Sequence, residues 1–177
     1  AKHGEVRNIS NTPKHREMSV SWSPNGKHIA YLSDATGEYE IYTRPQSGEG
    51  EAKQVTKGGS IWRFEPVWSP NSEAFAYADK NQTLWLTQAD GKGSIKVDTG
   101  TRNDINYYRW SPDSRWLTYI KVADNGMSSI FVYSTENKSI HQVTSDDTSD
   151  ANPVFSKDGN YLFFTSQRDY NLSFSSY

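Results

Sequence analysis

Trp22-Ser23-Pro24-Asn25-Gly26 is a five-residue phrase that recurs, with small changes, three more times along this 177-residue chain. The other copies are Trp68-Ser69-Pro70-Asn71-Ser72, Trp110-Ser111-Pro112-Asp113-Ser114 and Phe155-Ser156-Lys157-Asp158-Gly159. The aromatic residue that opens each copy follows the previous one by 46, 42 and 45 positions. A nearly constant spacing of this kind is typical of a protein built from repeated structural units.

Every copy has the composition of a tight β-turn. Proline presets the backbone angle φ of the first central position, and Asn or Asp followed by Gly or Ser suits the remaining corners. The aromatic residue before each turn is expected to end a strand. Segments rich in aromatic and aliphatic residues follow the turns and predict second strands at 27–32, 73–77, 115–120 and 160–164.

Two further phrases recur with the same period and predict the remaining strands. Polar hairpins follow the second strands and lead into third strands, which are expected around Ile41, Leu84, Ile130 and Leu172. Fourth strands are expected around Val55, Val97 and Val143. An outermost strand of the same kind is expected to open the chain at residues 6–10.

Four short antiparallel strands in every 42 to 46 residues are typical of a β-propeller blade. No helical periodicity occurs, and a β-sandwich has no reason to repeat one turn phrase at a fixed interval. We therefore predict an all-β fold, a single β-propeller segment over residues 1–177 with four blades of four antiparallel strands, belonging to a ring of six or seven blades. The blade repeats are expected at 14–56, 60–98, 102–144 and 148–177, the last completed by a strand at 5–10.

The composition agrees with an array of small repeated sheets. Hydrophobic residues make up 34% of the chain and aromatic residues 14%, so burial depends on a few large flat side chains. Trp22, Trp68, Trp110 and Phe155 hold one repeated position, and we expect them to pack between neighbouring blades. The net charge is −2 and no apolar run is long enough for a membrane helix, so neither nucleic acid nor membrane insertion is expected.

Residues that could carry chemistry are present but form no recognisable catalytic or metal motif. The four histidines show no metal-ligand pairing, cysteine is absent and no Gly-x-Ser-x-Gly phrase occurs. The acidic run 146–150 lacks the spaced loop and central glycine of a calcium site, which favours a solvated loop. We expect no catalytic residue, no metal and no cofactor in this chain. Asp34, Asp79, Asp124 and Asp169 recur every 45 residues and mark a repeated hairpin rather than paired catalytic carboxylates.

Loops that lead into the innermost strands surround the channel mouth of a propeller, so their polar residues are the best candidates for ligand contact. Trp62 differs from the repeated aromatics because it lies outside the turn phrase, just before an innermost strand. Salt bridges within the loops explain the charged candidates equally well. The substrate-channel candidates are Glu17, Trp62, Arg63, Glu65, Asp104 and Asp150.

Three stretches of the chain resemble the N-terminal propeller of tricorn-type serine peptidases and, more distantly, the propeller of TolB-like proteins. They are residues 4–13 (Gly-Glu-Val-Arg-Asn-Ile-Ser-Asn-Thr-Pro), the Trp-Ser-Pro-Asn-Gly turn, and residues 31–42. The turn is shared widely among propellers, whereas the other two stretches are more specific to the tricorn type. The resemblance implies a propeller that admits peptides to a distant active site and takes part in large assemblies, with the catalytic serine in another domain.

These observations leave three hypotheses on function. The first is a non-catalytic segment of a tricorn-like peptidase that serves peptide-substrate access, docking and assembly. The second is a TolB-like periplasmic propeller that binds proteins, and the third is the propeller of a prolyl-oligopeptidase-type hydrolase. Expected partners are peptides or proteins, with oligomerisation through the parent protein. The compartment stays open between periplasm or secretion and the cytoplasm, with the periplasm preferred.

Overall fold

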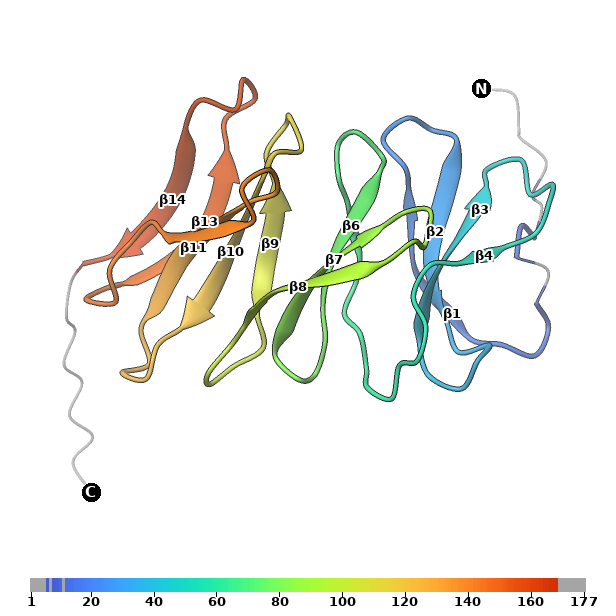
Figure 1. Cartoon of the computed structure of the whole chain (residues 1–177), viewed down its shortest axis with the longest axis horizontal. Coiled ribbons are helices and arrows are strands. Elements are labelled where there is room, and N and C mark those ends of the chain that lie inside the picture. The colour runs from blue at the N-terminus through green and yellow to red at the C-terminus, as the bar shows by residue number, and fades with distance from the viewer. Residues whose placement is uncertain (1–5, 7, 11, 169–177) are drawn as a thin grey trace. The chain divides into compact units, whose positions relative to one another are not determined.

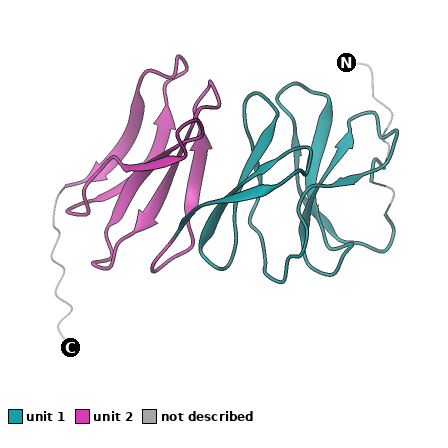
Figure 2. Ribbon diagram, viewed as in Figure 1, with its two compact units in different colours: residues 1–99 teal, residues 100–177 magenta. Residues whose placement is uncertain are grey.

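The computed structural model describes residues 6, 8–10 and 12–168. It divides the chain into two compact units, Ala1–Thr99 and Gly100–Tyr177 (Figure 2). All regular elements of the described residues are β-strands, and every strand pairing is antiparallel. The all-β prediction is confirmed.

The first unit contains two four-stranded sheets in which spatial order follows chain order (Figure 1). Sheet 1 consists of β1 (Glu17–Trp22), β2 (His28–Ser33), β3 (Glu40–Pro45) and β4 (Lys53–Gln54). Sheet 2 consists of β5 (Val67–Trp68), β6 (Ala74–Ala78), β7 (Thr83–Gln88) and β8 (Ser94–Thr99).

The second unit contains a third four-stranded sheet and a two-stranded one. Sheet 3 consists of β9 (Asn106–Trp110), β10 (Trp116–Val122), β11 (Ser128–Ser134) and β12 (Ser139–Gln142). Sheet 4 consists of β13 (Ser149–Phe155) and β14 (Leu162–Gln167), and β13 packs against sheet 3. The strand expected around Leu172 and the hairpin residue Asp169 lie outside the described residues.

Of the opening strand expected at 5–10, the structure describes residues 6 and 8–10, and these residues have no strand conformation. Ile9 instead packs against Ile29, Tyr31 and Tyr42 on one face of sheet 1. The carbonyl oxygen of Ser10 accepts a hydrogen bond of 2.8 Å from Arg44 Nη1. A side-chain donor therefore satisfies a backbone group that a strand ladder would otherwise have paired.

The four repeated aromatic residues occupy equivalent places. Trp22, Trp68, Trp110 and Phe155 each form the last residue of the first strand in their sheet. In each sheet the residue pairs across the ladder with the residue seven positions later, at the start of the second strand or next to it. The repeat unit inferred from the turn phrase is therefore a real structural unit.

One hydrogen-bond network closes the turn after every first strand. The serine accepts a bond from the backbone N–H five residues later and donates its hydroxyl to the Asn or Asp two residues later. That Asn or Asp also accepts from the backbone N–H of the residue two positions beyond it. The fourth turn keeps the whole network although Lys157 replaces proline, so the serine and the Asn or Asp define this turn.

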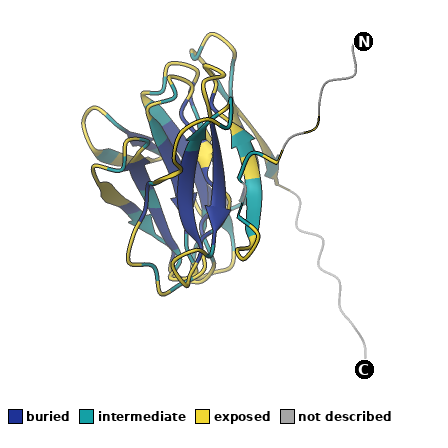
Figure 3. Ribbon diagram, turned by 90° about the vertical axis from the view of Figure 1, so that its right-hand side faces the viewer, coloured by how far each residue is buried: buried dark blue, intermediate teal, exposed yellow. Residues whose placement is uncertain are grey.

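Apolar side chains from both sheets of the first unit form its core. Ala30, Leu32 and Ile41 of sheet 1 pack with Trp68, Phe75 and Tyr77 of sheet 2. The Trp68 and Phe75 rings lie 4.0 Å apart between centroids. Burial is greatest in the middle strands of the sheets (Figure 3), as expected for sheets that stack face to face.

The expectation that all four repeated aromatics are buried between blades is correct for Trp68, which is 8% exposed, and wrong for Trp22, which is 58% exposed. Trp110 and Phe155 are partly buried. Trp22 pairs with Ile29, whose side chain belongs to the face of sheet 1 opposite the shared core. The repeated position therefore points away from the following sheet and toward the preceding one, as Trp68 does.

A repeated backbone kink was not predicted. Ser19, Tyr107 and Asn152 have φ angles of 55°, 54° and 55°, and each lies three residues before the repeated aromatic. The strand pairing shifts register at the same places, which identifies β-bulges. Sheet 2 departs from the pattern, since its first strand β5 is only two residues long and its pairing with β6 has no register shift.

Substitution of Gly26 tests the turn geometry. Gly26 has a φ of +71°, and a Cβ added there would meet nothing within 4 Å. We expect Gly26→Ala to lower the free energy of unfolding by about 1 kcal/mol through backbone strain alone, and Gly26→Asn to lower it less. Urea denaturation of both variants measures this, and equal stability of wild type and Gly26→Ala would contradict it.

The turn carboxylates predict a pH dependence. Hydrogen bonds from the Ser111 and Ser156 hydroxyls hold the pKa of Asp113 and of Asp158 below the ordinary value of 3.8. Because the folded pKa is the lower one, both groups stabilise the fold at neutral pH, and this contribution is lost as the pH falls through the folded pKa. The double variant Asp113→Asn, Asp158→Asn should therefore lose less stability than wild type between about pH 5 and pH 3. Urea midpoints that fall equally in both proteins would contradict this.

Candidate functional site

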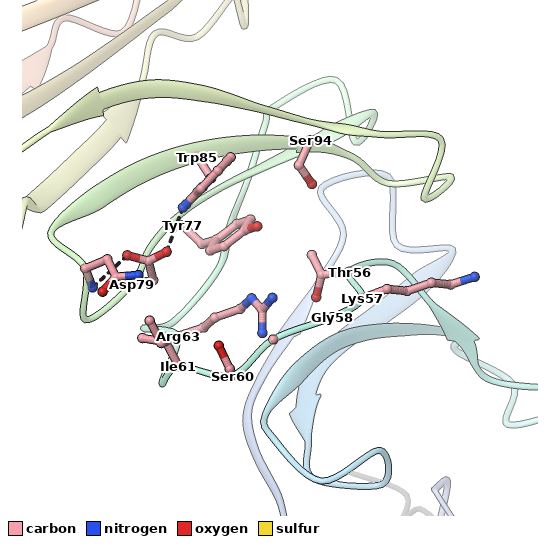
Figure 4. A pocket seen from close by; sticks show the side chains of 12 residues that line it. Thr56, Lys57, Gly58, Ser60, Ile61, Arg63, Tyr77, Asp79, Trp85 and Ser94 are labelled. Atoms are coloured by element: carbon pink, nitrogen blue, oxygen red, sulfur yellow. Dashed lines mark hydrogen bonds between the residues drawn. The ribbon is translucent and has the colours of Figure 1, made fainter.

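A polar pocket of about 280 Å³ lies in the first unit, where the chain passes from β4 of sheet 1 to β5 of sheet 2. The connecting residues 56–63 form one side of the pocket, and β6, β7 and β8 form the other. Figure 4 shows the side chains of Arg63, Tyr77 and Thr56 turned toward the same space.

A buried ion pair includes one residue of the pocket lining, Arg63. Arg63 Nη1 lies 3.1 Å from Glu40 Oε2, and the two side chains are 10% and 2% exposed. Two charges removed from water are tolerated only where each is paired and hydrogen-bonded. The pair joins the two sheets, because Glu40 begins β3 and Arg63 precedes β5.

Further hydrogen bonds complete the ion pair. Glu40 Oε2 accepts from Thr56 Oγ1 at 2.5 Å, and Glu40 Oε1 accepts from the backbone N–H of Gly59 at 2.6 Å. Arg63 Nη1 also donates to the carbonyl oxygen of Tyr39 at 2.8 Å. A Cβ on Gly59 would lie 2.0 Å from Arg63 Nη1, so only glycine fits beside the guanidinium. The loop sequence is therefore adapted to this charge pair.

Aromatic side chains form the opposite wall. The Arg63 guanidinium lies 5.9 Å from the Tyr77 ring centroid, close enough for a cation–π contact. Burial raises the pKa of the Tyr77 hydroxyl, and hydrogen bonding to Ser94 and the nearby Arg63 charge oppose that rise. Asp79 accepts a hydrogen bond of 2.8 Å from the Trp85 indole N–H. The pocket thus offers hydroxyl groups and ring faces around a neutralised charge pair.

The structure brings two of the predicted channel residues, Trp62 and Arg63, to this site. Arg63 lines the pocket, and Trp62 is 40% exposed and meets the Tyr39 ring edge to face at 4.9 Å. Glu65 is exposed two residues further along and is not part of the pocket lining. Glu17 begins β1 and accepts a hydrogen bond of 2.5 Å from Thr12 Oγ1.

The remaining two candidates lie in the second unit. Asp104 is partly buried in the loop before β9. Asp150 is the second residue of β13 and is 2% exposed. It lines two adjoining pockets of that unit.

Sequence reasoning missed Glu40, Thr56 and Gly59. Glu40 was assigned only to a strand, although the equivalent residues before Leu84 and Ile130 are the uncharged Thr83 and Ser129. A carboxylate at a strand position that carries uncharged residues in the other repeats was the available signal, because a buried charge needs a partner.

The described residues hold no group of three or more His, Cys, Asp or Glu side chains that could bind a metal ion. They also contain no helix long and apolar enough to cross a membrane.

The chain matches a known protein family over nearly its whole length. The family model described as the tricorn protease second beta propeller domain matches residues 1–176. This chain belongs to that family. The finding confirms the tricorn resemblance, and it specifies the second propeller where the three sequence stretches indicated the N-terminal one.

Two curated relatives match nearly the whole of this chain. The tricorn protease homolog 1 of Streptomyces coelicolor is 22% identical over 175 residues, which cover 96% of this chain and 16% of the homolog. An uncharacterized protein of Agrobacterium fabrum, Atu1656, is 25% identical over 170 residues, covering 93% of this chain and 55% of that protein. The chain therefore spans between about a sixth and about half of the length of these curated relatives.

Solved structures show the same fold. The crystal structure of the tricorn protease superposes with a TM-score of 0.82 at 18% identity, over 93% of this chain and 16% of that one. A putative TolB from Agrobacterium tumefaciens gives 0.65 at 21% identity, over 92% of this chain and 57% of that one. The β-propeller prediction is confirmed by this likeness.

The Glu40–Arg63 pair predicts a stability pattern. Removing one partner leaves an uncompensated buried charge, so Glu40→Gln or Arg63→Met should each lower the free energy of unfolding by about 3 to 5 kcal/mol. The double variant Glu40→Gln, Arg63→Met should lose less than the sum of the two. Chemical denaturation of the three variants measures the coupling, and simple additivity would contradict a direct interaction.

Proposed function

We propose that this chain is a non-catalytic propeller segment of a tricorn-like peptidase that docks peptide substrates and contributes to the assembly of the parent protein. The observation that carries the proposal is the polar pocket of the first unit, lined in part by Arg63 of the buried Glu40–Arg63 pair. Peptide-bond cleavage would belong to another part of the parent.

The chemistry of the pocket supports a peptide ligand. Thr56, Ser60 and Ser94 place hydroxyl groups around it, and each hydroxyl can both donate and accept. The Arg63 charge is balanced by Glu40, so the pocket does not select strongly for an anion. An extended peptide presents alternating N–H and C=O groups, which such a surface can bind with little regard to sequence.

The surrounding geometry supports a docking site rather than a flexible loop. Arg63 and Tyr77 are 9% and 4% exposed, so contacts on several sides hold their positions. Side chains that are already ordered lose little conformational entropy when a ligand binds. Trp62, which is 40% exposed, extends an aromatic surface next to the pocket. In this proposal Trp62 and Arg63 are the substrate-channel residues of the first unit, with Glu17, Glu65, Asp104 and Asp150 as further candidates.

Exposed apolar side chains support a role in assembly. Trp22 is 58% exposed in sheet 1, and Tyr161 and Phe163 are 65% and 59% exposed in the second unit. Aromatic faces of this size usually mark surfaces that contact other protein. We propose that further blades of a six- or seven-bladed ring cover them in the parent protein.

Two other kinds of full-length protein contain a propeller of this fold. A TolB-like protein and a prolyl endopeptidase both superpose with a TM-score of 0.65. The full-length gene separates the three cases: a downstream serine-peptidase region of the tricorn type supports the proposal. An upstream small α/β domain or a Gly-x-Ser-x-Gly hydrolase domain would replace it.

A blocking substitution tests peptide docking. Ser60 is exposed at the pocket and takes no part in the ion pair, so Ser60→Trp should fill the pocket without disturbing the sheets. We expect this variant to bind an unstructured peptide, such as reduced and alkylated insulin B chain, at least fivefold more weakly than wild type. Isothermal titration or chemical-shift perturbation measures the difference.

The control places the same bulk elsewhere. Gln46 is exposed in the turn between β3 and β4, and it is not among the residues that line the pocket. Gln46→Trp should therefore bind the peptide as wild type does. Equal affinity of the Ser60→Trp and Gln46→Trp variants would refute docking at this pocket.

A further inference from the structure

One position of the repeat carries a charge in three of its four copies. The residue five places before the repeated aromatic is Glu17, Arg63, Ile105 or Asp150. In the first unit the Arg63 charge at this position is met by Glu40 from the neighbouring sheet. In the second unit, the charged residue at this position has no such partner within the residues that the structure describes.

Asp150 is buried without a cation. The residue is 2% exposed, and within the described part of the chain its carboxylate has one hydrogen bond, from Thr148 Oγ1 at 3.3 Å. No Lys, Arg or His there lies within ion-pair distance of it. Ser129 of β11 holds the place of Glu40 and donates its hydroxyl to the carbonyl oxygen of Ser145.

A carboxylate in this situation is costly to bury. An ionised group removed from water needs an opposite charge or several hydrogen bonds to offset its lost hydration. The weak bond from Thr148 supplies little of that compensation. The fold therefore contains a buried carboxylate that no positive charge among the described residues neutralises.

Space for a ligand lies beside Asp150. Two adjoining pockets of about 480 and 560 Å³ both include it in their lining. The hydroxyl groups of Thr144, Thr148 and Ser166 surround the first pocket, and those of Ser128 and Ser149 belong to the second. These groups can accept hydrogen bonds from a ligand that donates several.

We propose that Asp150 binds the basic side chain, guanidinium or ammonium, of a peptide docked on the propeller. The assignment rests on the proposed peptide-docking function and adds a preference for Lys or Arg to it. A guanidinium carries five N–H donors in a fixed plane, which suits one carboxylate flanked by hydroxyl oxygens.

Arg168 provides an internal check. It lines both pockets and is exposed, and it forms no ion pair with Asp150. As a like charge near the ligand, it should oppose binding of a basic group. Arg168→Ala is therefore expected to bind an arginine peptide at least as tightly as wild type, and weaker binding would contradict the proposal.

Matched peptides test the charge preference. The probes are acetyl-Gly-Arg-Gly-amide and the same peptide with citrulline, which has nearly the shape of arginine but no charge. We expect wild type to bind the arginine peptide at least tenfold more tightly, measured by chemical-shift titration of the whole 177-residue chain. The preference should fall below twofold in Asp150→Asn and persist in Asp147→Asn, whose side chain is exposed.

Thermal unfolding shows whether Asp150→Asn loses peptide binding only because the variant is less stable. Because Asp150 lacks an internal cation, Asp150→Asn should keep or raise the Tm of the free protein. A lower Tm would indicate an internal partner and would overturn the proposal. An unchanged arginine preference in Asp150→Asn would also overturn it.

The results separate this inference from the function on which it rests. Peptides that bind equally well with arginine or citrulline, and more weakly to Ser60→Trp, would refute the role of Asp150 and leave docking intact. Absence of binding by wild type to these peptides and to the insulin B chain would refute both.

Discussion

The stacking of one sheet on the next through an aromatic side chain is the constraint on which the first unit depends. Trp68 ends the first strand of sheet 2, and its ring reaches the face of sheet 1 that carries Ala30 and Leu32. Two-residue alternation along each strand commits the opposite set of side chains to the other face. Trp22 and Trp68 both point toward the preceding side of their own sheet. Trp68 meets sheet 1 there and is buried, whereas Trp22 lies on the face of sheet 1 opposite the shared core and is exposed. The exposed aromatic surface at Trp22 is therefore a direct result of the repeat.

The turns keep each strand in register so that this stacking can occur. A serine, buried in the first three copies and partly exposed in the fourth, supplies hydrogen bonds to the backbone together with an Asn or Asp in all four copies, with or without proline. A one-residue slip would turn every inward side chain outward. The bulges at Ser19, Tyr107 and Asn152 add a bend in the first strands at one fixed distance from the aromatic. The turns are regular in all four sheets, whereas the bulges recur in sheets 1, 3 and 4.

Functional differences arise where equivalent positions carry different chemistry. Arg63 and Asp150 stand at the same place in the repeat, yet one is neutralised by Glu40 and the other faces an open polar pocket. The backbone is common to both, so the change lies in the charge and in what the neighbouring sheet offers. Repeats allow this because each sheet interacts chiefly with its neighbours. A polar group can then be varied in one blade without disturbing the turns of the others.

The sequence by itself determined the fold class, the period and the place of the turn after each first strand, because these depend on local chemistry that recurs in each copy. From its position before an innermost strand, the sequence also made Arg63 a candidate for ligand contact, which stays a prediction. Only the tertiary structure decided which side chains meet. Glu40 and Gly59 lie 19 residues apart, and their contact depends on how sheet 1 approaches the loop that follows it. The sequence predicted burial for both Trp22 and Trp68, but the structure buries only Trp68, because equivalent positions acquire different surroundings when a neighbouring sheet packs on one of them and not on the other.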